Sequence, residues 1–479
     1  MSLQLRYGRP GYIPSFPAIM SVPDVSEVTR EMEVPSPPLA KKKARPPSGD
    51  EIIGTSRSAS VEELRRQANL YFVEGDWIRT ARTLEQLVRR EPSAESYFLL
   101  GMTYSMAQNF LAAAGAFEEA VKLRPDHLMA QFNLGTAYLM HYIHTGENSV
   151  LEQAIKPFKK TIGIGTRQNQ AALSLGFIYD MRGDKRLAEK YYLKAAELSD
   201  NPSSAYQNLA KLYMNAGDDQ PARREHYYLK AADALQKALQ TAPDKSDVYN
   251  FLGHAYAAIG KTKLALEAFK RAVEVDNNNL LALANLVSAY LDAKQNEEAQ
   301  EASRRIIRTN VQTIRNYITR KLGRPPADTE VFRSDAYVGY GVASMELYRV
   351  RVEAASEQEP SAPDPKLLQD AENALKKAIE IYPENGNALY DLAVLYYRLD
   401  RLEEAREAIR SLLAIDPENE AIKNLVNRLL EDQLQQRLLA HGLLKEVRGT
   451  VIDLRPYQNR TAMPASGKPL SQLVIEGRR

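Results

Sequence analysis

Histidines are the residues of this chain that could most readily bind a metal or move a proton, and there are six of them. His141 and His144 lie three residues apart, so on a helix both imidazoles would face one side and could share a metal ion. Two imidazoles alone make a weak zinc site. We therefore interpret this pair as part of a polar helix face, and we expect neither a bound metal nor another cofactor.

Other catalytic groupings are missing from the sequence. The absence of cysteine excludes disulfides, thiolate nucleophiles and cysteine-ligated zinc. No phosphate-binding glycine loop, nucleophile elbow or zinc-protease motif occurs. His254 belongs to no recognisable carboxylate, histidine and hydroxyl grouping, and carboxylate pairs such as Glu403-Glu404 are interpreted as solvated helix faces. We expect a protein that is not an enzyme and that has no small-molecule substrate.

The charge and hydropathy of the chain bear on its partners and location. Residues 61–446 carry 49 basic and 53 acidic side chains, and such a mildly acidic body lacks the basic surface that nucleic acid selects. The longest apolar stretch, Leu280 to Leu291, is too short to span a bilayer, and prolines interrupt the N-terminus where a signal peptide needs an apolar run. We expect a cytoplasmic protein with neither a membrane nor nucleic acid as its main partner.

The strongest pattern in the sequence is a repeated segment of eight residues. Four copies align by eye: YFLLGMTY (97–104), QFNLGTAY (131–138), YQNLAKLY (206–213) and YNFLGHAY (249–256). Each has Leu, then a small residue, then Tyr three positions later. Downstream, Ala precedes a large apolar residue by four positions and a small residue by seven, as in Ala113, Phe117 and Ala120. Self-similarity at a fixed period is the signature of a repeat protein.

The two patterns resemble the tetratricopeptide repeat, whose period of about 34 residues has these residue types at these offsets. The small residue of each copy, which we call the anchor, falls at Ala68, Gly101, Gly135, Gly176, Ala210, Gly253, Val287, Gly341 and Ala393. Successive anchors are 33, 34, 41, 34, 43, 34, 54 and 52 residues apart. The resemblance implies an all-α fold, an α-α superhelix (solenoid) of about nine helical hairpins with a C-terminal capping helix.

Helix geometry explains why these residue types recur. Leu and Tyr four positions apart share one helix face, and the small residue between them lies where a partner helix approaches. The aromatic periodicity is therefore expected to be core. Gly75-Asp76, Gly183-Asp184 and Gly217-Asp218 predict turns between helices, and prolines such as Pro125 separate one hairpin from the next. Because one hairpin cannot bury its own apolar face, stacked neighbours must supply the core.

The pattern divides the chain into four parts. Residues 1–60, rich in Pro and Ser, are predicted to be a disordered arm, and residues 61–417 to form the repeat array. The long gaps place insertions near 141–150, 218–228, 308–334 and 345–370. We interpret 308–334 as an irregular connector and 345–370 as containing a mobile loop. Residues 418–446 are predicted to form the capping helix, and 447–479 an extended basic tail.

A basic cluster in the arm, PPLAKKKARPP, brings together Lys41, Lys42, Lys43 and Arg45. Two interpretations stay open, a nuclear-import signal or a basic linker. Such clusters are frequent by chance, so we favour the linker.

The resemblance also implies where a partner would bind. In similar proteins, the first helix of each repeat lines a groove that receives an extended peptide or a helix. The groove-facing residue two positions before the anchor is often Asn, because an amide both donates to and accepts from a peptide backbone. The candidates are Asn133, Asn208, Asn285 and Asp391, with Asn250 beside the Phe251 of the sixth repeat. Ser174 breaks the row in the fourth repeat, and a solvated polar surface is the alternative interpretation.

These expectations lead to three hypotheses about function. The leading one is a scaffold or adaptor that holds a peptide or helix of a partner protein in the groove. The second is an accessory or regulatory subunit of an enzyme complex, such as one associated with a glycosyltransferase. The third is a helical-repeat RNA-binding protein that uses the basic arm and tail.

Overall fold

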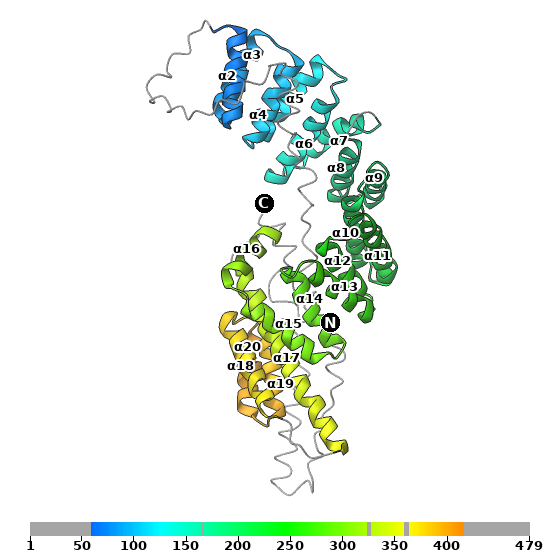
Figure 1. The fold of residues 1–479 in the computed structure, drawn as a ribbon, viewed down its shortest axis with the longest axis vertical. Helices are drawn as coiled ribbons and strands as arrows, with labels where there is room; N and C mark the ends of the chain where they lie inside the picture. The colour runs from blue at the N-terminus through cyan, green and yellow to red at the C-terminus, as the bar shows by residue number, and fades with distance from the viewer. Residues whose placement is uncertain (1–58, 164–166, 323–326, 359–363, 416–479) are drawn as a thin grey trace, which may run out of the picture. The chain divides into compact units, whose positions relative to one another are not determined.

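The structure is a computed structural model of the chain, and it describes residues 59–163, 167–322, 327–358 and 364–415. Over these residues it contains nineteen α-helices and one 3₁₀ turn, without a strand (Figure 1). The fold is thus all-α, as predicted. The helices form two compact parts, which divide within α10 between Leu212 and Tyr213, and each part is described by itself.

The N-terminal part consists of successive helical hairpins. These are α2 (Val61–Glu74) with α3 (Trp77–Arg90), α4 (Ala94–Met106) with α5 (Phe110–Leu123), α6 (Leu128–Thr145) with α7 (Ser149–Thr161), α8 (Gln168–Met181) with α9 (Lys185–Glu197), and the first residues of α10 (Ser203–Asp219). The second helix of each hairpin also packs against the first helix of the next, as α3 does on α4 and α5 on α6. Neighbouring hairpins therefore share their apolar interior.

The C-terminal part continues the same arrangement. It contains the end of α10, η3 (Pro221–Arg223), α11 (Arg224–Thr241), α12 (Ser246–Ala257), α13 (Thr262–Val275), α14 (Leu280–Asp292), α15 (Asn296–Arg308), α16 (Val311–Leu322), α17 (Ala327–Gln358), α18 (Lys366–Ile381), α19 (Gly386–Arg398) and α20 (Leu402–Ile415). The helices pair as α12 with α13, α14 with α15, α17 with α18 and α19 with α20. All nine anchors lie in the first helix of a hairpin, so the predicted hairpins are confirmed over the described residues.

At four of the glycine anchors, an aromatic ring of the partner helix packs directly on the glycine. A β-carbon on Gly101 would lie 2.6 Å from the Phe117 ring, and one on Gly253 would lie 2.6 Å from the Phe269 ring. Phe117 and Phe269 are themselves fully buried. The close approach predicted at the anchor is thus confirmed, and the aromatic periodicity is core.

In several hairpins, the tyrosine three residues after the anchor forms a hydrogen bond with the hairpin before it. The Tyr104 hydroxyl donates to Glu85 Oε1 at 2.6 Å, and the Tyr138 hydroxyl donates to Glu118 Oε1 at 2.5 Å. Burial and the neighbouring carboxylate raise the pKa of Tyr104 to about 12. Tyr104 and Tyr138 therefore donate hydrogen bonds across hairpin boundaries, besides packing against the core.

The prediction of a turn at Gly217-Asp218 is wrong. Gly75 and Gly183 do lie in left-handed turns, with φ of 75° and 78°, but Gly217 lies inside α10. The insertion near 218–228 instead lengthens the α10–α11 hairpin. A β-carbon on Gly217 would lie 2.8 Å from the Tyr228 ring, so the contact between a small residue and an aromatic ring recurs about two helical turns beyond the anchor.

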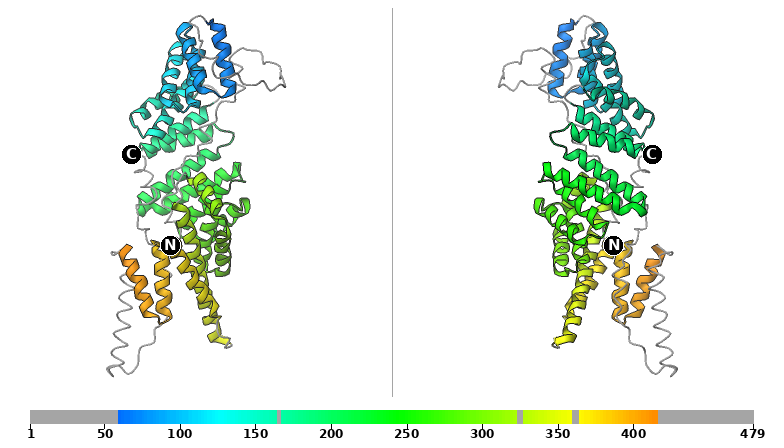
Figure 2. Two further views of the ribbon diagram at one scale, coloured as in Figure 1. Left: turned by 90° about the vertical axis from the view of Figure 1, so that its left-hand side faces the viewer. Right: turned by 90° about the vertical axis from the view of Figure 1, so that its right-hand side faces the viewer.

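The segment 308–334 is not an irregular connector over its described residues. Val311–Leu322 is helix α16, and α17 begins at Ala327. Residues 345–358, the first part of the insertion at 345–370, are also helical, so the first four residues of the predicted mobile loop, 355–366, belong to α17. Runs of residues with good helix propensity outweigh the lack of an obvious repeat. Figure 2 shows the last turns of α17, in yellow, standing clear of α18 to α20.

Several predictions fall outside the described residues. These are the N-terminal arm up to residue 58, the basic cluster at 41–45, the loop residues 359–363, the capping helix at 418–446 and the basic tail at 447–479.

Candidate peptide-binding face

In each compact part, helices that carry the anchors contact one another, and we call them the first-helix layer of that part. In the N-terminal part α4 contacts α6 and α6 contacts α8; in the C-terminal part α12 contacts α14 and α17 contacts α19. Two positions concern the candidate site, the residue two before the anchor and the residue one after it. They are three residues apart and so lie on the same side of the helix.

The predicted site residues lie where consecutive first helices meet. Asn285 Nδ2 on α14 donates to Asn250 Oδ1 on α12 at 2.9 Å, and both side chains are partly exposed. Asn133 Nδ2 on α6 lies 3.4 Å from Met102 Sδ on α4. The structure therefore brings Asn250 and Asn285 together, although nothing in the repeat pattern pairs these two residues.

Three of the five predicted residues are more buried than a solvated groove position would be. Asn133, Asn208 and Asp391 are all buried between helices. A guest chain on this face would therefore meet Asn250 and Asn285 first. The sequence pattern could not show this, because burial here depends on how closely the neighbouring first helix approaches.

Several buried polar atoms on this face have no hydrogen-bond partner. Ser174 Oγ and Asn208 Oδ1 belong to the position two before the anchor, and Asn69 Oδ1 and His254 Nδ1 to the position one after it. A buried polar atom without a partner costs about 1–3 kcal/mol, so native proteins contain few of them. Their gathering at two positions of the repeat marks this side of the first helices as polar and incompletely satisfied.

His254 lies beside the lengthened hairpin. Its ring is 6.4 Å from that of Tyr228, whose hydroxyl donates to Asp218 Oδ1 at 2.8 Å. Burial lowers the pKa of His254 to about 4, and the nearby Asp218 opposes this shift only in part. The imidazole is therefore neutral at physiological pH and can accept as well as donate a hydrogen bond.

Two sets of side-chain hydrogen bonds, which we call polar clasps, join the N-terminal end of one first helix to the preceding first helix. Sequence reasoning missed both. Asn279 caps α14 by accepting from Ala282 N, while its Nδ2 donates to Ser246 Oγ at 2.8 Å and to Asp247 Oδ1 at 3.2 Å on α12. Tyr317 of α16 also donates to Asn279 Oδ1 at 2.7 Å.

The second clasp repeats the first. Asn385 caps α19, and its Nδ2 donates to Ser334 Oγ at 2.8 Å and to Asp335 Oδ1 at 3.0 Å on α17. The available signal was a Ser-Asp pair on one first helix, at the start of α12 but inside α17, and a capping Asn before the next first helix. Both clasps set the spacing of neighbouring first helices.

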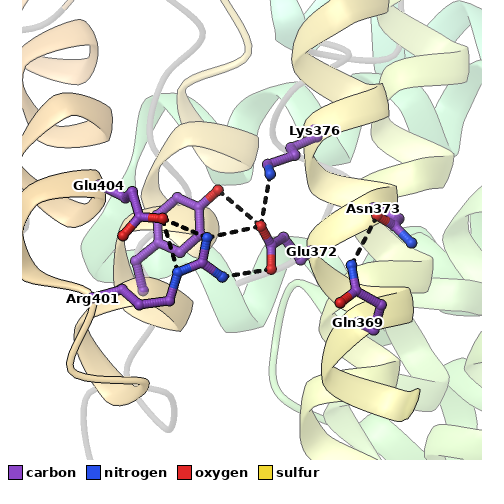
Figure 3. A network of polar contacts seen from close by, with 7 residues as sticks. Gln369, Glu372, Asn373, Lys376, Arg401 and Glu404 are labelled. Atoms are coloured by element: carbon purple, nitrogen blue, oxygen red, sulfur yellow. Dashed lines mark hydrogen bonds and ion pairs between the residues drawn. The ribbon is translucent and has the colours of Figure 1, made fainter. Parts of the chain in front are cut away.

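An ionic network positions the last described hairpin (Figure 3). Glu372 on α18 accepts from Arg401 Nη1 at 2.7 Å, from Lys376 Nζ at 2.7 Å and from the Tyr396 hydroxyl at 3.2 Å. Arg401 also lies over the Tyr396 ring, 4.4 Å from its centroid. These hydrogen bonds hold the pKa of Glu372 down at about 2. The network links α18 to α19, the helix that carries Asp391.

The histidine pair near the first insertion makes other contacts. His141 Nε2 lies 3.2 Å from Glu147 Oε2, and His144 Nδ1 lies 2.9 Å from the Met140 carbonyl oxygen. Within the described ranges, no cluster of three or more His, Asp or Glu side chains is arranged to hold a metal ion. In the same ranges, no helix combines the length and apolar character needed to cross a bilayer.

Comparison with protein families gives three matches, all to models of the tetratricopeptide repeat. They cover residues 106–147, 246–279 and 365–429. Among solved structures, a tetratricopeptide repeat protein from Parabacteroides merdae is similar to 58% of this chain over 99% of its own length, with 15% identity and a TM-score of 0.39.

Curated relatives are similar over part of their length. Tetratricopeptide repeat protein 37 of Xenopus laevis is 25% identical over 268 residues, which are 50% of this chain and 17% of the relative. Anaphase-promoting complex subunit 3 of Schizosaccharomyces pombe is 26% identical, over 44% of this chain and 29% of its own length. Human protein O-mannosyl-transferase TMTC3 is 24% identical, over 65% of this chain and 34% of its own length. This chain thus spans about a third or less of these relatives.

Proposed function

We propose that this chain, a tetratricopeptide repeat protein, is an interaction scaffold that binds an extended peptide or a helix of a partner protein along the first-helix layer of its C-terminal part. The observation that carries the proposal is the partly exposed amide pair that Asn250 of α12 and Asn285 of α14 form where two first helices meet. A guest backbone carries one N–H donor and one C=O acceptor on each residue other than proline, and side-chain amides can bond to both.

The partly exposed pair Asn250 and Asn285 is the entry point for such a guest. In their mutual hydrogen bond, Asn285 supplies one amide proton and Asn250 its carbonyl oxygen, so each side chain keeps further donor or acceptor capacity. A guest backbone could bond to both amides, while Asn133 and Asn208 stay behind as part of the packing between helices. Binding would then depend on the Asn250–Asn285 pair more than on the buried candidates.

The test removes this pair and compares it with a matched pair elsewhere. Gln369 Nε2 donates to Asn373 Oδ1 at 3.2 Å on α18, an exposed amide pair on a second helix of the same part of the chain (Figure 3). We would recover partners from native cells with tagged wild-type chain, with Asn250→Ala/Asn285→Ala and with Gln369→Ala/Asn373→Ala. Quantitative mass spectrometry would compare the three, after circular dichroism has shown equal helicity.

We expect the Asn250/Asn285 variant to bind the partners of the wild type about thirtyfold more weakly and to recover correspondingly less of them, because two side-chain hydrogen bonds at about 1 kcal/mol each are lost. The Gln369/Asn373 variant should recover them normally. Equal recovery by all three proteins would remove the first-helix layer as the binding face, and equal loss in both variants would show a nonspecific effect.

A second candidate, membership of a larger assembly, is favoured by the names of two relatives. They are a subunit of the anaphase-promoting complex and Superkiller complex protein 3. In this candidate the array holds other subunits rather than one peptide. Cross-linking of the native protein followed by mass spectrometry would distinguish the two, since a single partner joined only to first helices would speak against an assembly subunit.

A further inference from the structure

Helix α8 carries a charged residue at a position that the other hairpins fill with uncharged side chains. Asp180 lies four residues after its anchor, Gly176. Most residues at this position are large and apolar, and the most buried of them, Leu139 and Met214, are 0% and 1% exposed. Asp180 therefore stands where the repeat usually places an apolar contact. In the other eight hairpins the position is occupied by Phe72, Ser105, Leu139, Met214, Ala257, Leu291, Met345 and Tyr397.

The surroundings of the Asp180 carboxylate are unfavourable for a charge. The side chain is partly buried, and within the described residues it forms neither a hydrogen bond nor an ion pair. Asp180 is also the last residue but one of α8, at the negative end of the helix dipole, where an anion is destabilised. Burial raises the pKa of Asp180 to about 6, and Lys185 on α9 opposes this shift only in part. The charge thus has a cost that its described neighbours do not fully offset.

The basic residue nearest to Asp180 in the sequence has other partners. Arg182 Nη1 lies 2.6 Å from Glu152 Oε1 on α7, and the Arg182 guanidinium also lies over the Tyr179 ring, 5.8 Å from its centroid. The chain therefore places a cation two residues away without using it to neutralise Asp180. Residues that break the local rules of a fold without compensation are expected mainly at functional sites.

The residue after Asp180 is an exposed methionine. Met181 is 44% exposed and lies four residues after the buried Phe177, so both are on the side of α8 that belongs to the first-helix layer. An accessible thioether chain thus adjoins an unpaired carboxylate at the end of this helix. Arginine and lysine side chains combine an aliphatic stem with a cationic head. They therefore complement both groups at once.

We propose that Asp180 and Met181 form a subsite for an arginine or lysine side chain of a partner polypeptide. The cationic head pairs with the Asp180 carboxylate, and the aliphatic stem packs on Met181. Charge complementarity selects this occupant, because a cation offsets both the burial of the carboxylate and its position at the helix end. The subsite belongs to the N-terminal part, so it is separate from the Asn250–Asn285 pair and does not depend on binding there.

The first experiment asks whether Asp180 is unpaired in the full-length chain. Carboxyl carbon-13 NMR should show Asp180 titrating near pH 6, and Asp180→Asn should raise the urea midpoint at pH 7, because it removes an uncompensated charge. A pKa below about 4 together with destabilisation by Asp180→Asn overturns the proposal, since the chain itself then supplies the cation. A rise of that low pKa when the basic cluster at 41–45 is replaced by glutamine would identify the cluster as the source.

The second experiment uses N-acetylarginine amide as the probe and N-acetylcitrulline amide as its neutral counterpart. Both are capped at each end, so they differ only in the charge of the side chain. In NMR of methyl-labelled methionines at constant ionic strength, the Met181 resonance should shift and saturate with the arginine probe, with a dissociation constant of about 1–30 mM. The citrulline probe should bind at least about tenfold more weakly.

Two variants assign the effect to the carboxylate. Asp180→Asn should abolish the preference for arginine over citrulline, whereas Asp200→Asn, which removes the same charge from an exposed site in the same part of the chain, should keep it. An equal response of the wild type to the two probes overturns the proposal. Loss of the preference in Asp200→Asn to the same extent as in Asp180→Asn also overturns it, because the effect then follows net charge alone.

Discussion

Replacing Glu372 by glutamine tests how far one ionic network stabilises the last described hairpin. The carboxylate accepts hydrogen bonds from α18, from Tyr396 of α19 and from Arg401, which immediately precedes α20 (Figure 3). The substitution keeps the size of the side chain but removes its charge. The residue is buried, so Arg401 and Lys376 lose a partner that water replaces only in part.

The shifted pKa of Glu372 gives the size of its contribution to the free energy of unfolding. A change from 4.5 to about 2 corresponds to about 3 kcal/mol, because one pKa unit is about 1.4 kcal/mol. The Glu372 side chain is only 8% exposed, but Arg401 is 34% and Lys376 is 54% exposed, so water screens part of the interaction. We expect Glu372→Gln to lower the local unfolding free energy of α18 to α20 by about 2 kcal/mol at pH 7.

The pH dependence has a definite sign. The folded-state pKa of Glu372 is depressed, so its stabilisation is fully present above about pH 4.5 and is lost as the pH falls toward 2. The wild type and Glu372→Gln should therefore differ most near neutral pH and converge at acid pH.

Hydrogen exchange of the α18 to α20 amides is the appropriate assay, since repeat arrays open locally. Glu403→Gln is the control, because Glu403 makes an exposed ion pair with Arg406 on α20 and should contribute less than about 1 kcal/mol. A difference between wild type and Glu372→Gln that does not change between pH 7 and pH 3, or one no larger than that of Glu403→Gln, would refute the reasoning.

Two further predictions concern the anchors and the buried histidine. Gly101→Ala should lower the free energy of unfolding by about 2 kcal/mol in urea titrations, because its β-carbon meets the Phe117 ring at 2.6 Å; Gly115→Ala on α5, with open space around it, should instead be neutral or stabilising. His254 should keep a constant imidazole chemical shift between pH 5.5 and 8 in NMR, because burial lowers its pKa to about 4. Since unfolding would free this imidazole to bind a proton, His254 should reduce stability as the pH falls below about 6.5, and a titration near neutral pH would show that it is solvated.

The amino-acid sequence alone determined the repeat and its register. Leu, a small residue and Tyr at fixed offsets specify which residues of a helix meet the next helix, so the nine anchors and their hairpins followed from local pattern. The apolar stripe of the second helix was evident too, although the sequence did not show which of its side chains meets each glycine. The sequence also indicated the insertions, but it did not show that the residues after Gly217 and Ser344 extend helices.

Tertiary packing decided how the candidate site is presented. Asn133, Asn208 and Asp391 have the residue types of a groove, yet their neighbouring helices approach closely enough to bury them. Asn250 and Asn285 form a hydrogen-bonded pair across 35 residues of sequence, and the capping Asn385 reaches Ser334 and Asp335 across a whole hairpin. The pattern within one repeat specifies which side of a helix is polar. How much of that side stays accessible depends on the distance to the next helix, which is set by contacts between repeats.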